Sequence, residues 1–328
     1  MSPRHSLRPR AGARSGQSGR RRSRILRLLG IGLALALAAC ELEETTLTEP
    51  EDVIVAEVYL HANVSPQYAF LHRTLGTTGD GRVIGARIEI RNRSGERLDF
   101  LEEPTRENCL VLIEPPPPGG TCYRSRSTGF VFPGEPYILH IELPDGRALT
   151  GSTVVPGDFQ LLAPRLTNFA PSCRLPPDTA LRLVWSPAAD AWAYVGETNL
   201  FGLRAALEPR GIEVEEDPLR LFGLSRSSAD TAIVFPTEFG IFERLDLDRD
   251  LALAIRHGLP DETRARITIA AVDRNYVLWA RGGNFNPSGL VRVPTIRGDG
   301  TGVFASLVPK EVFVVVDDST SWVPDCRT

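Results

Sequence analysis

Hydrophobic and polar residues alternate with a period of two in several short stretches, and this pattern most narrows the folds open to the chain. The clearest case is the stretch in which Tyr137, Leu139, Ile141 and Leu143 occupy every second position. Successive side chains of a β-strand point to opposite faces of its sheet. The alternation therefore predicts a strand with one buried face.

Turn residues separate these stretches at short intervals. Residues 144–146 (Pro-Asp-Gly) are expected to form a turn before a returning strand at 148–154, because proline fixes φ and glycine accepts the left-handed conformation. Further strands are expected at 54–60 and at 86–91, and Ser94-Gly95 supplies the turn after the latter. Short strands at this spacing are typical of an antiparallel β-sandwich.

The second half of the chain opens with a pattern typical of a fibronectin type III module. Trp185 lies on an early candidate strand, and a second strand with Tyr194 follows a short Pro- and Ala-containing loop. Later strands are expected at 267–271 and around Tyr276 and Trp279. We therefore predict a mainly β chain with two antiparallel Ig-like or fibronectin type III-like β-sandwich domains in tandem.

The length agrees with two domains, since about 280 residues remain after the N-terminal segments. The expected division is a signal peptide at 1–39, a tether at 40–51, an N-terminal β-sandwich at 52–162, a linker at 163–173 and a C-terminal fibronectin type III-like domain at 174–328.

The first forty residues have the three zones of a bacterial lipoprotein signal. Nine arginines and no acidic residue precede an apolar run at 28–39, which is shorter than the roughly 20 residues of a membrane-spanning helix. Leu37-Ala38-Ala39-Cys40 then matches a lipobox. This predicts cleavage before Cys40 and attachment of palmitate-like acyl chains to its thiol, which would anchor the protein on a membrane. The alternative is an ordinary cleaved signal with a chance cysteine.

Charge also limits the partners. Removing nine arginines changes the formal net charge from −4 to −13, and an acidic body disfavours nucleic acid as a partner. Glu41, Glu43 and Glu44 resemble the acidic export signal of surface lipoproteins in some phyla. We therefore expect a lipid-anchored protein of the outer membrane, with its periplasmic or surface face left open.

Four cysteines remain once Cys40 carries lipid. Cys109 and Cys122 flank a short Pro- and Gly-rich loop, and Cys173 and Cys326 bracket the second half of the chain. Position therefore favours the disulfides Cys109–Cys122 and Cys173–Cys326 over the other connectivities. A zinc site is the alternative, but the chain has no Cys-x-x-Cys pair and its histidines are scattered.

Three stretches carry a resemblance to a known family. They are residues 85–90 (Gly-Ala-Arg-Ile-Glu-Ile), 133–156 and 275–304. Together they resemble the bacterial lipoproteins of domain of unknown function 4249, over roughly residues 40–316. The resemblance implies an exported, lipid-anchored β-rich protein that serves as an accessory to outer-membrane transporters, and it implies no catalytic residues. Residues 133–156 alone would also suit a carboxypeptidase-regulatory-like domain.

Sequence motifs for catalysis or cofactor binding are absent: the chain has no Gly-x-Ser-x-Gly elbow, His-Glu-x-x-His helix or phosphate-binding glycine loop. Residues 246–250 open like a calcium loop, but Leu251 replaces the required glycine and His257 the required glutamate. A charged turn before a short helix within 248–257 is the expected structure. We predict no metal, no cofactor and no enzymatic activity.

Aromatic residues near expected loop or strand ends are the remaining candidates for ligand or partner contact. Phe285, Trp192 and Trp279 are the three that we select, with core packing as the alternative for the tryptophans. The expected function is a non-enzymatic binding or accessory module for an outer-membrane transporter or another envelope protein. A structural or adhesive envelope protein is the first alternative, and a secreted glycan hydrolase with an acidic pair is the second.

Overall fold

Strands dominate the structure, as the alternating pattern predicts. The computed structural model describes residues 52–74, 81–110, 119–166, 172–236, 249–282, 292–318 and 323–326. These ranges all belong to one compact unit that begins at Glu51. The expected signal peptide, Cys40 and the tether lie outside the described residues. None of the helices within the described ranges is long and apolar enough to span a membrane.

The N-terminal half of the described chain holds seven strands and one short helix. They are β1 (Ile54–His61), β2 (Tyr68–Arg73), β3 (Arg87–Asn92), β4 (Arg97–Glu103), α2 (Glu107–Leu110), β5 (Thr121–Ser125), β6 (Pro136–Glu142) and β7 (Ala148–Val154).

The C-terminal half follows with these elements: β8 (Leu161–Ala163), β9 (Ser172–Leu175), β10 (Leu181–Trp185), β11 (Ala193–Phe201), α3 (Leu203–Leu207), η1 (Glu208–Arg210), β12 (Leu219–Leu224), β13 (Ala232–Phe235), α4 (Arg249–Ala254), β14 (Arg264–Val272), α5 (Arg274–Arg281), β15 (Ile296–Gly298) and β16 (Gly300–Val316).

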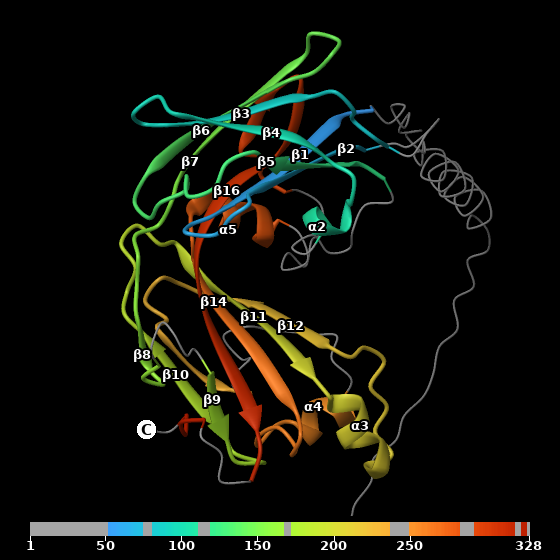
Figure 1. Cartoon of the computed structure of the whole chain (residues 1–328), viewed down its shortest axis with the longest axis vertical. Coiled ribbons are helices and arrows are strands. Elements are labelled where there is room, and N and C mark those ends of the chain that lie inside the picture. Colours follow the sequence, from blue (N-terminus) through green and yellow to red (C-terminus); the bar gives the residue numbers. More distant parts are fainter. Residues whose placement is uncertain are drawn as a thin grey trace, which may run out of the picture. The chain divides into compact units, whose positions relative to one another are not determined.

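One long strand joins the two halves. Among the described residues, a 13-stranded sheet has the order β12-β11-β14-β16-β1-β2-β5-β4-β3-β6-β7-β15, with β9 also on β16, and a second sheet has the order β13-β10-β8. The first part of β16 pairs in parallel with β1, and its second part pairs antiparallel with β14, so it runs from the upper strands of Figure 1 into the lower ones. The chain is thus mainly β, with β-sandwiches in tandem that share this strand.

The end of the chain contributes to both halves. Ile296 to Gly298 pairs with β7, and Gly300 to Leu307 pairs with β1. The expected C-terminal domain at 174–328 therefore supplies strands to the sheets of the N-terminal half. The expected linker at 163–173 includes Ser172 and Cys173, which belong to β9. Long-range pairing of this kind is not encoded in local patterns.

The alternating stretches form the expected strands. In β6, Tyr137, Leu139 and Ile141 are buried and the residues between them are exposed, and the returning strand is β7 at the expected bounds. Trp185 is buried against Tyr194, with ring centroids 5.3 Å apart. The short helix expected within 248–257 is α4.

Tyr276 and Trp279 correct the expectation of a late strand, because both lie on the helix α5. The side chain of Asp273 accepts a hydrogen bond from the backbone N–H of Tyr276, 2.9 Å away. An aspartate in this position satisfies one of the free N–H groups at a helix start, which ends the strand and begins a helix.

Both expected disulfides are present. Cys109 of α2 is bonded to Cys122 of β5, and Cys173 of β9 is bonded to Cys326 near the end of the chain. The first bond holds α2 on the sheet, and the second closes a segment of 153 residues.

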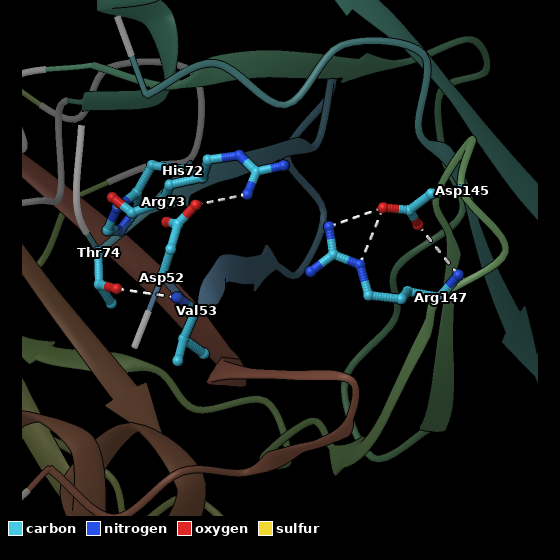
Figure 2. Close-up of polar contacts among 7 residues, drawn as sticks. All are labelled: Asp52, Val53, His72, Arg73, Thr74, Asp145 and Arg147. Atoms are coloured by element: carbon cyan, nitrogen blue, oxygen red, sulfur yellow. Dashed lines mark hydrogen bonds and ion pairs between the residues drawn. The ribbon is translucent and has the colours of Figure 1, made fainter. Parts of the chain in front are cut away.

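The described chain enters the fold at the first end of β1. The Asp52 carboxylate pairs with the Arg73 guanidinium at 2.7 Å, and the Val53 N–H donates to the Thr74 hydroxyl at 3.0 Å. Figure 2 shows these contacts, together with the ion pair of Asp145 with Arg147 in the turn after β6. The contacts hold the first described residues against the end of β2.

Candidate functional site

A cavity of about 920 Å³ lies against the middle of the long sheet. Strands from both halves line it, together with α2 and α5. Its volume falls within the range of small-molecule sites, which is roughly 300–1,000 Å³. The cavity is therefore the candidate functional site of the described residues.

The two faces of β1 have different roles. Ala56, Val58 and Leu60 point into the main core, as the period of two predicts. The residues between them, Glu57 and Tyr59, line the cavity instead of facing solvent. A strand with both faces covered loses the simple alternation of buried and exposed positions.

Gln67 defines the end of β1. Its side-chain carbonyl accepts a hydrogen bond from the His61 N–H, and its amide donates to the His61 C=O, each at 2.9 Å. A third hydrogen bond from the amide reaches the Val64 C=O. These bonds turn the chain away from β16 after His61.

A gap in the sheet follows from this turn. Pairing of β1 with β16 ends at Leu307, and pairing of β9 with β16 begins at Phe313. Between these two points, no strand of the described chain pairs with that edge of β16. The Leu307 C=O faces this edge of β16, because it accepts a hydrogen bond from the Ala62 N–H. Alternation along the strand places the C=O of Pro309 on the same edge. Proline is tolerated at such an open edge because it has no N–H to pair.

Three residues at this gap line the cavity: Pro309, Lys310 and Glu311. The Lys310 ammonium contacts Asp158 Oδ1 at 2.8 Å. It also lies 5.9 Å from the centre of the Phe159 ring. Among the described residues, the cavity is therefore bounded by an unpaired strand edge as well as by side chains.

Polar side chains cross the floor of the cavity in one row. Strand register places Glu197 of β11 beside Thr268 of β14, and Thr268 beside Glu311 of β16. The Glu197 carboxylate pairs with the Arg220 guanidinium at 3.1 Å and accepts from the Asn199 amide at 3.4 Å. The charge of Glu197 is thus already paired.

Glu57 has the most confined carboxylate of the cavity. It is 5% exposed. The Tyr59 hydroxyl donates to Glu57 Oε2 at 3.3 Å, and His72 Nε2 lies 3.5 Å from Glu57 Oε1. Phe70 lies directly opposite Glu57 on β2. The Tyr59 ring meets the Tyr276 ring edge-on at 5.7 Å.

Burial changes the titration of three groups on this face. Burial raises the pKa of Tyr59 well above its usual value, and the negative charge of Glu57 adds to the effect. Burial also raises the pKa of Tyr276, with the charge of Glu197 as a smaller cause. For His61, burial lowers the pKa to about 4, so its imidazole is neutral at physiological pH.

The two described tryptophans among the aromatic residues selected from the sequence do not line this cavity. Trp192 is 51% exposed, with the Arg274 guanidinium 5.3 Å from its ring centre, and it does not line the cavity. Trp279 is packed in a buried cluster under the Arg292 guanidinium, so little of its ring is accessible. Phe285 lies outside the described residues.

Within the described ranges, no three His, Cys, Asp or Glu side chains are close enough to hold a metal ion. Asp246 and Asp248 of the calcium-like motif lie outside those ranges. His140 is exposed on β6.

Neither a protein-family model nor a curated protein matches the chain. Among solved structures, the fibronectin(III)-like modules of CbhA from Clostridium thermocellum match at 13% identity and a TM-score of 0.19, covering 80% of this chain and 90% of that one. The two tandem V-type regions of the v-region-containing chitin binding protein VCBP3 match at 10% identity and a TM-score of 0.18, covering 80% and 100%. A DUF4785 family protein from Legionella pneumophila matches at 8% identity and a TM-score of 0.21, covering 66% and 51%.

TM-scores this low carry no conclusion about the fold or the role of this chain. The resemblance to domain of unknown function 4249 stays a prediction from the sequence.

Proposed function

We propose that this protein is an exported, lipid-anchored envelope protein that acts as a non-enzymatic binding module, with the cavity as its contact site. Two disulfides support an oxidising, extracytoplasmic compartment. The arginine-rich start, the apolar run and the lipobox at Cys40 support export and lipid attachment. Palmitate-like chains on Cys40 would hold the folded part at the outer membrane.

The cavity supplies the observation that carries the binding proposal. It combines aromatic rings, a confined carboxylate and, among the described residues, an unpaired strand edge in one concave space. Pockets that bind ligands share this composition of apolar walls with a few convergent polar groups.

The position of the cavity along β1 suits a tethered binding module. The chain enters at Asp52, whereas Glu57, Tyr59 and His61 line the cavity toward the far end of the strand. Eight residues of strand extend about 26 Å. A tether of residues 40–51 reaches at most about 40 Å when fully extended. These lengths are compatible with the proposal that the partner is an envelope protein such as an outer-membrane transporter.

Lipid attachment is tested by metabolic labelling. We expect cells that express the full chain with Cys40 intact to incorporate radiolabelled palmitate into it, and Cys40→Ser to lose the label and to leave the membrane fraction. Cys40 is the cysteine to substitute, because the other four cysteines form the two disulfides. Labelling that persists in Cys40→Ser would contradict the anchor.

The binding module is tested by site-specific photocrosslinking in intact cells. A benzophenone amino acid at Tyr68, which lines the cavity, is expected to capture a defined envelope component. The same group at Ile138, which is 57% exposed on β6 and does not line the cavity, is the control and is expected to capture nothing in common with it. Equal products at both positions, or none at Tyr68, would refute the cavity as a contact site.

A glycan hydrolase is the second candidate, favoured by one observation. Glu197 and Glu311 lie two strands apart in one row on the cavity floor, with backbones about 10 Å from each other. Inverting glycosidases separate their two carboxyl groups by about 6.5–9.5 Å. Release of reducing ends from envelope polysaccharide that Glu311→Gln abolishes would establish this candidate in place of the binding module.

A further inference from the structure

Glu57 has fewer partners than a buried carboxylate requires. A carboxylate has about four acceptor positions. In the described structure Glu57 accepts one long hydrogen bond, from the Tyr59 hydroxyl, and its other neighbour is the imidazole of His72 at 3.5 Å. That imidazole nitrogen itself lacks a hydrogen-bond partner. Burial of an incompletely paired charge costs free energy that a ligand of opposite charge would recover.

A second buried glutamate shows how this chain satisfies such a group elsewhere. Glu89 of β3 is also 5% exposed. It forms ion pairs with both Arg91 and Arg97. Burial raises the pKa of Glu89, but these guanidinium groups outweigh the burial and hold it below its usual range. No arginine or lysine forms such a pair with Glu57 in the described part of the chain.

Aromatic rings surround the Glu57 carboxylate. Tyr59 and Tyr276 pack against each other beside it, Phe70 lies opposite it, and Tyr68 lies opposite Tyr59. All four rings line the cavity. The face of an aromatic ring attracts a cation, and the attraction grows when water is excluded. We call Glu57 and these four rings the Glu57 pocket.

The cations near the Glu57 pocket are engaged elsewhere. Lys310 pairs with Asp158, and Arg266 lies over the Phe313 ring at 5.6 Å. Arg292 lies over the Trp279 ring at 4.9 Å; its charge is felt at Tyr59, where it lowers the pKa. Among the described residues, no guanidinium or ammonium group therefore forms an ion pair with the Glu57 carboxylate.

We infer that the Glu57 pocket is a binding site for an organic ammonium group. This inference deepens the proposed function, on which it rests, by naming the chemical class that the cavity recognises. The group belongs either to a small amine such as a quaternary ammonium compound or to a lysine side chain of a partner protein. In both cases the carboxylate supplies the charge and the rings supply the walls.

The first experiment compares a cation with its neutral isostere. Full-length protein in a non-ionic maltoside detergent is titrated calorimetrically with choline and, separately, with 3,3-dimethyl-1-butanol, which has the same shape without the charge. We expect choline to bind about tenfold or more tightly than the alcohol, because only choline offers a cation to the rings and carboxylate. Equal affinities, or no binding of choline, would overturn the inference, and this comparison needs no variant.

The second experiment uses two isosteric variants. Glu57→Gln removes the charge and keeps the shape, and we expect it to weaken choline binding by about tenfold or more. Glu89→Gln is the matched control, equally buried but remote from the cavity lining, and is expected to leave choline binding unchanged. A Glu57→Gln protein that melts normally and binds choline with undiminished affinity would overturn the assignment.

A third arm separates the two sources of the ammonium group. If a partner lysine is the occupant, a lysine-containing peptide competes with the photocrosslink from Tyr68 and its norleucine analogue does not. If a small amine is the occupant, choline binds and neither peptide competes. Loss of palmitate labelling or of the crosslink refutes the proposed function and leaves choline binding as an independent result. No binding of choline, with the palmitate label and the crosslink intact, refutes the ammonium site alone.

Discussion

Two buried polar regions meet at helix α5, and they differ in how completely their hydrogen bonds are satisfied. The first, which we call the joint, links β7, β14 and β16 through Thr153, Asp273 and Ser306. Thr153 donates to Asp273 Oδ2 at 2.5 Å and lies 2.8 Å from the Ser306 hydroxyl. The second is the Glu57 pocket, where the carboxylate accepts a single long hydrogen bond. Tyr276 belongs to both, since its N–H donates to Asp273 and its ring lines the cavity.

The difference indicates what each region does. Buried polar groups in folded proteins are nearly always hydrogen-bonded, and a satisfied network fixes one arrangement of the elements that share it. The joint fits this description, and it is reinforced by Asn275, whose amide donates to the Ser152 and Phe304 carbonyls at 2.8 Å each. In the Glu57 pocket the carboxylate lacks a full set of hydrogen bonds, as expected of a site in which a ligand supplies the missing partner.

Removal of the joint carboxylate is expected to have the largest effect on stability. We expect Asp273→Ala to lower the free energy of unfolding by about 3 kcal/mol at pH 5, because it removes a helix N-cap and leaves Thr153 and Ser306 buried with fewer partners. Chemical denaturation followed by circular dichroism measures this. A loss below about 1 kcal/mol would mean that the joint does not hold the two halves together.

The pH dependence of stability tests the same carboxylate. Burial raises the pKa of Asp273 to about 6, against the counteracting hydrogen bonds from Thr153 and the Tyr276 backbone. Between its usual pKa of 3.8 and about 6, the folded state binds more protons than the unfolded state, so the contribution to stability is full below this window and is lost as pH rises through it. Two pKa units correspond to roughly 2–3 kcal/mol.

Asp273→Asn is the control for this prediction, since asparagine also caps helices and does not titrate. The free energy of unfolding of the natural protein minus that of Asp273→Asn is expected to fall by roughly 2–3 kcal/mol from pH 4 to pH 7. A difference that stays constant, or that rises with pH, would refute the raised pKa.

Local patterns in the sequence account for much of the fold. The alternation at 137–143 predicts β6, the Pro-Asp-Gly turn predicts the return into β7, and the spacing of cysteines predicts both disulfides. The sequence did not predict the helix α5, because Tyr276, Val277 and Trp279 after β14 are residue types that favour strands. An aspartate three residues before Tyr276 is a capping signal that would have marked the change.

The candidate site was not predictable in the same way. Glu57 interrupts the apolar stretch of β1, and alternation alone would place it in solvent. Glu57 is buried because α5, β2 and β16 pack around β1. These elements lie up to some 250 residues away along the chain, so local patterns do not indicate the contact. The role of Pro309 likewise cannot be predicted from the sequence. It depends on where the pairing of β16 with β1 ends and where its pairing with β9 begins.

The two buried glutamates offer a smaller test of the comparison. We expect Glu57→Gln to leave the free energy of unfolding unchanged or to raise it by about 1 kcal/mol, because the natural carboxylate is buried without a full set of partners. Glu89→Gln is expected to lower it by about 1 kcal/mol, because it loses charge-assisted bonds to Arg91 and Arg97. Urea denaturation of both variants decides this, and a destabilisation of Glu57→Gln as large as that of Glu89→Gln would place Glu57 with the structural groups.

Trp192 tests the outer edge of the joint and carries the smallest expected effect. Its N–H donates to the Val272 carbonyl at 2.9 Å through the backbone, which survives substitution, and its half-exposed ring contacts the Arg274 guanidinium. An exposed cation–π contact contributes about 0.5 kcal/mol, so Trp192→Ala should change the free energy of unfolding by about that amount and leave choline binding unaltered. A loss of unfolding free energy several times larger would show that the Trp192 ring supports the joint. A loss of the Tyr68 crosslink in Trp192→Ala would show instead that the partner extends from the cavity to this exposed tryptophan.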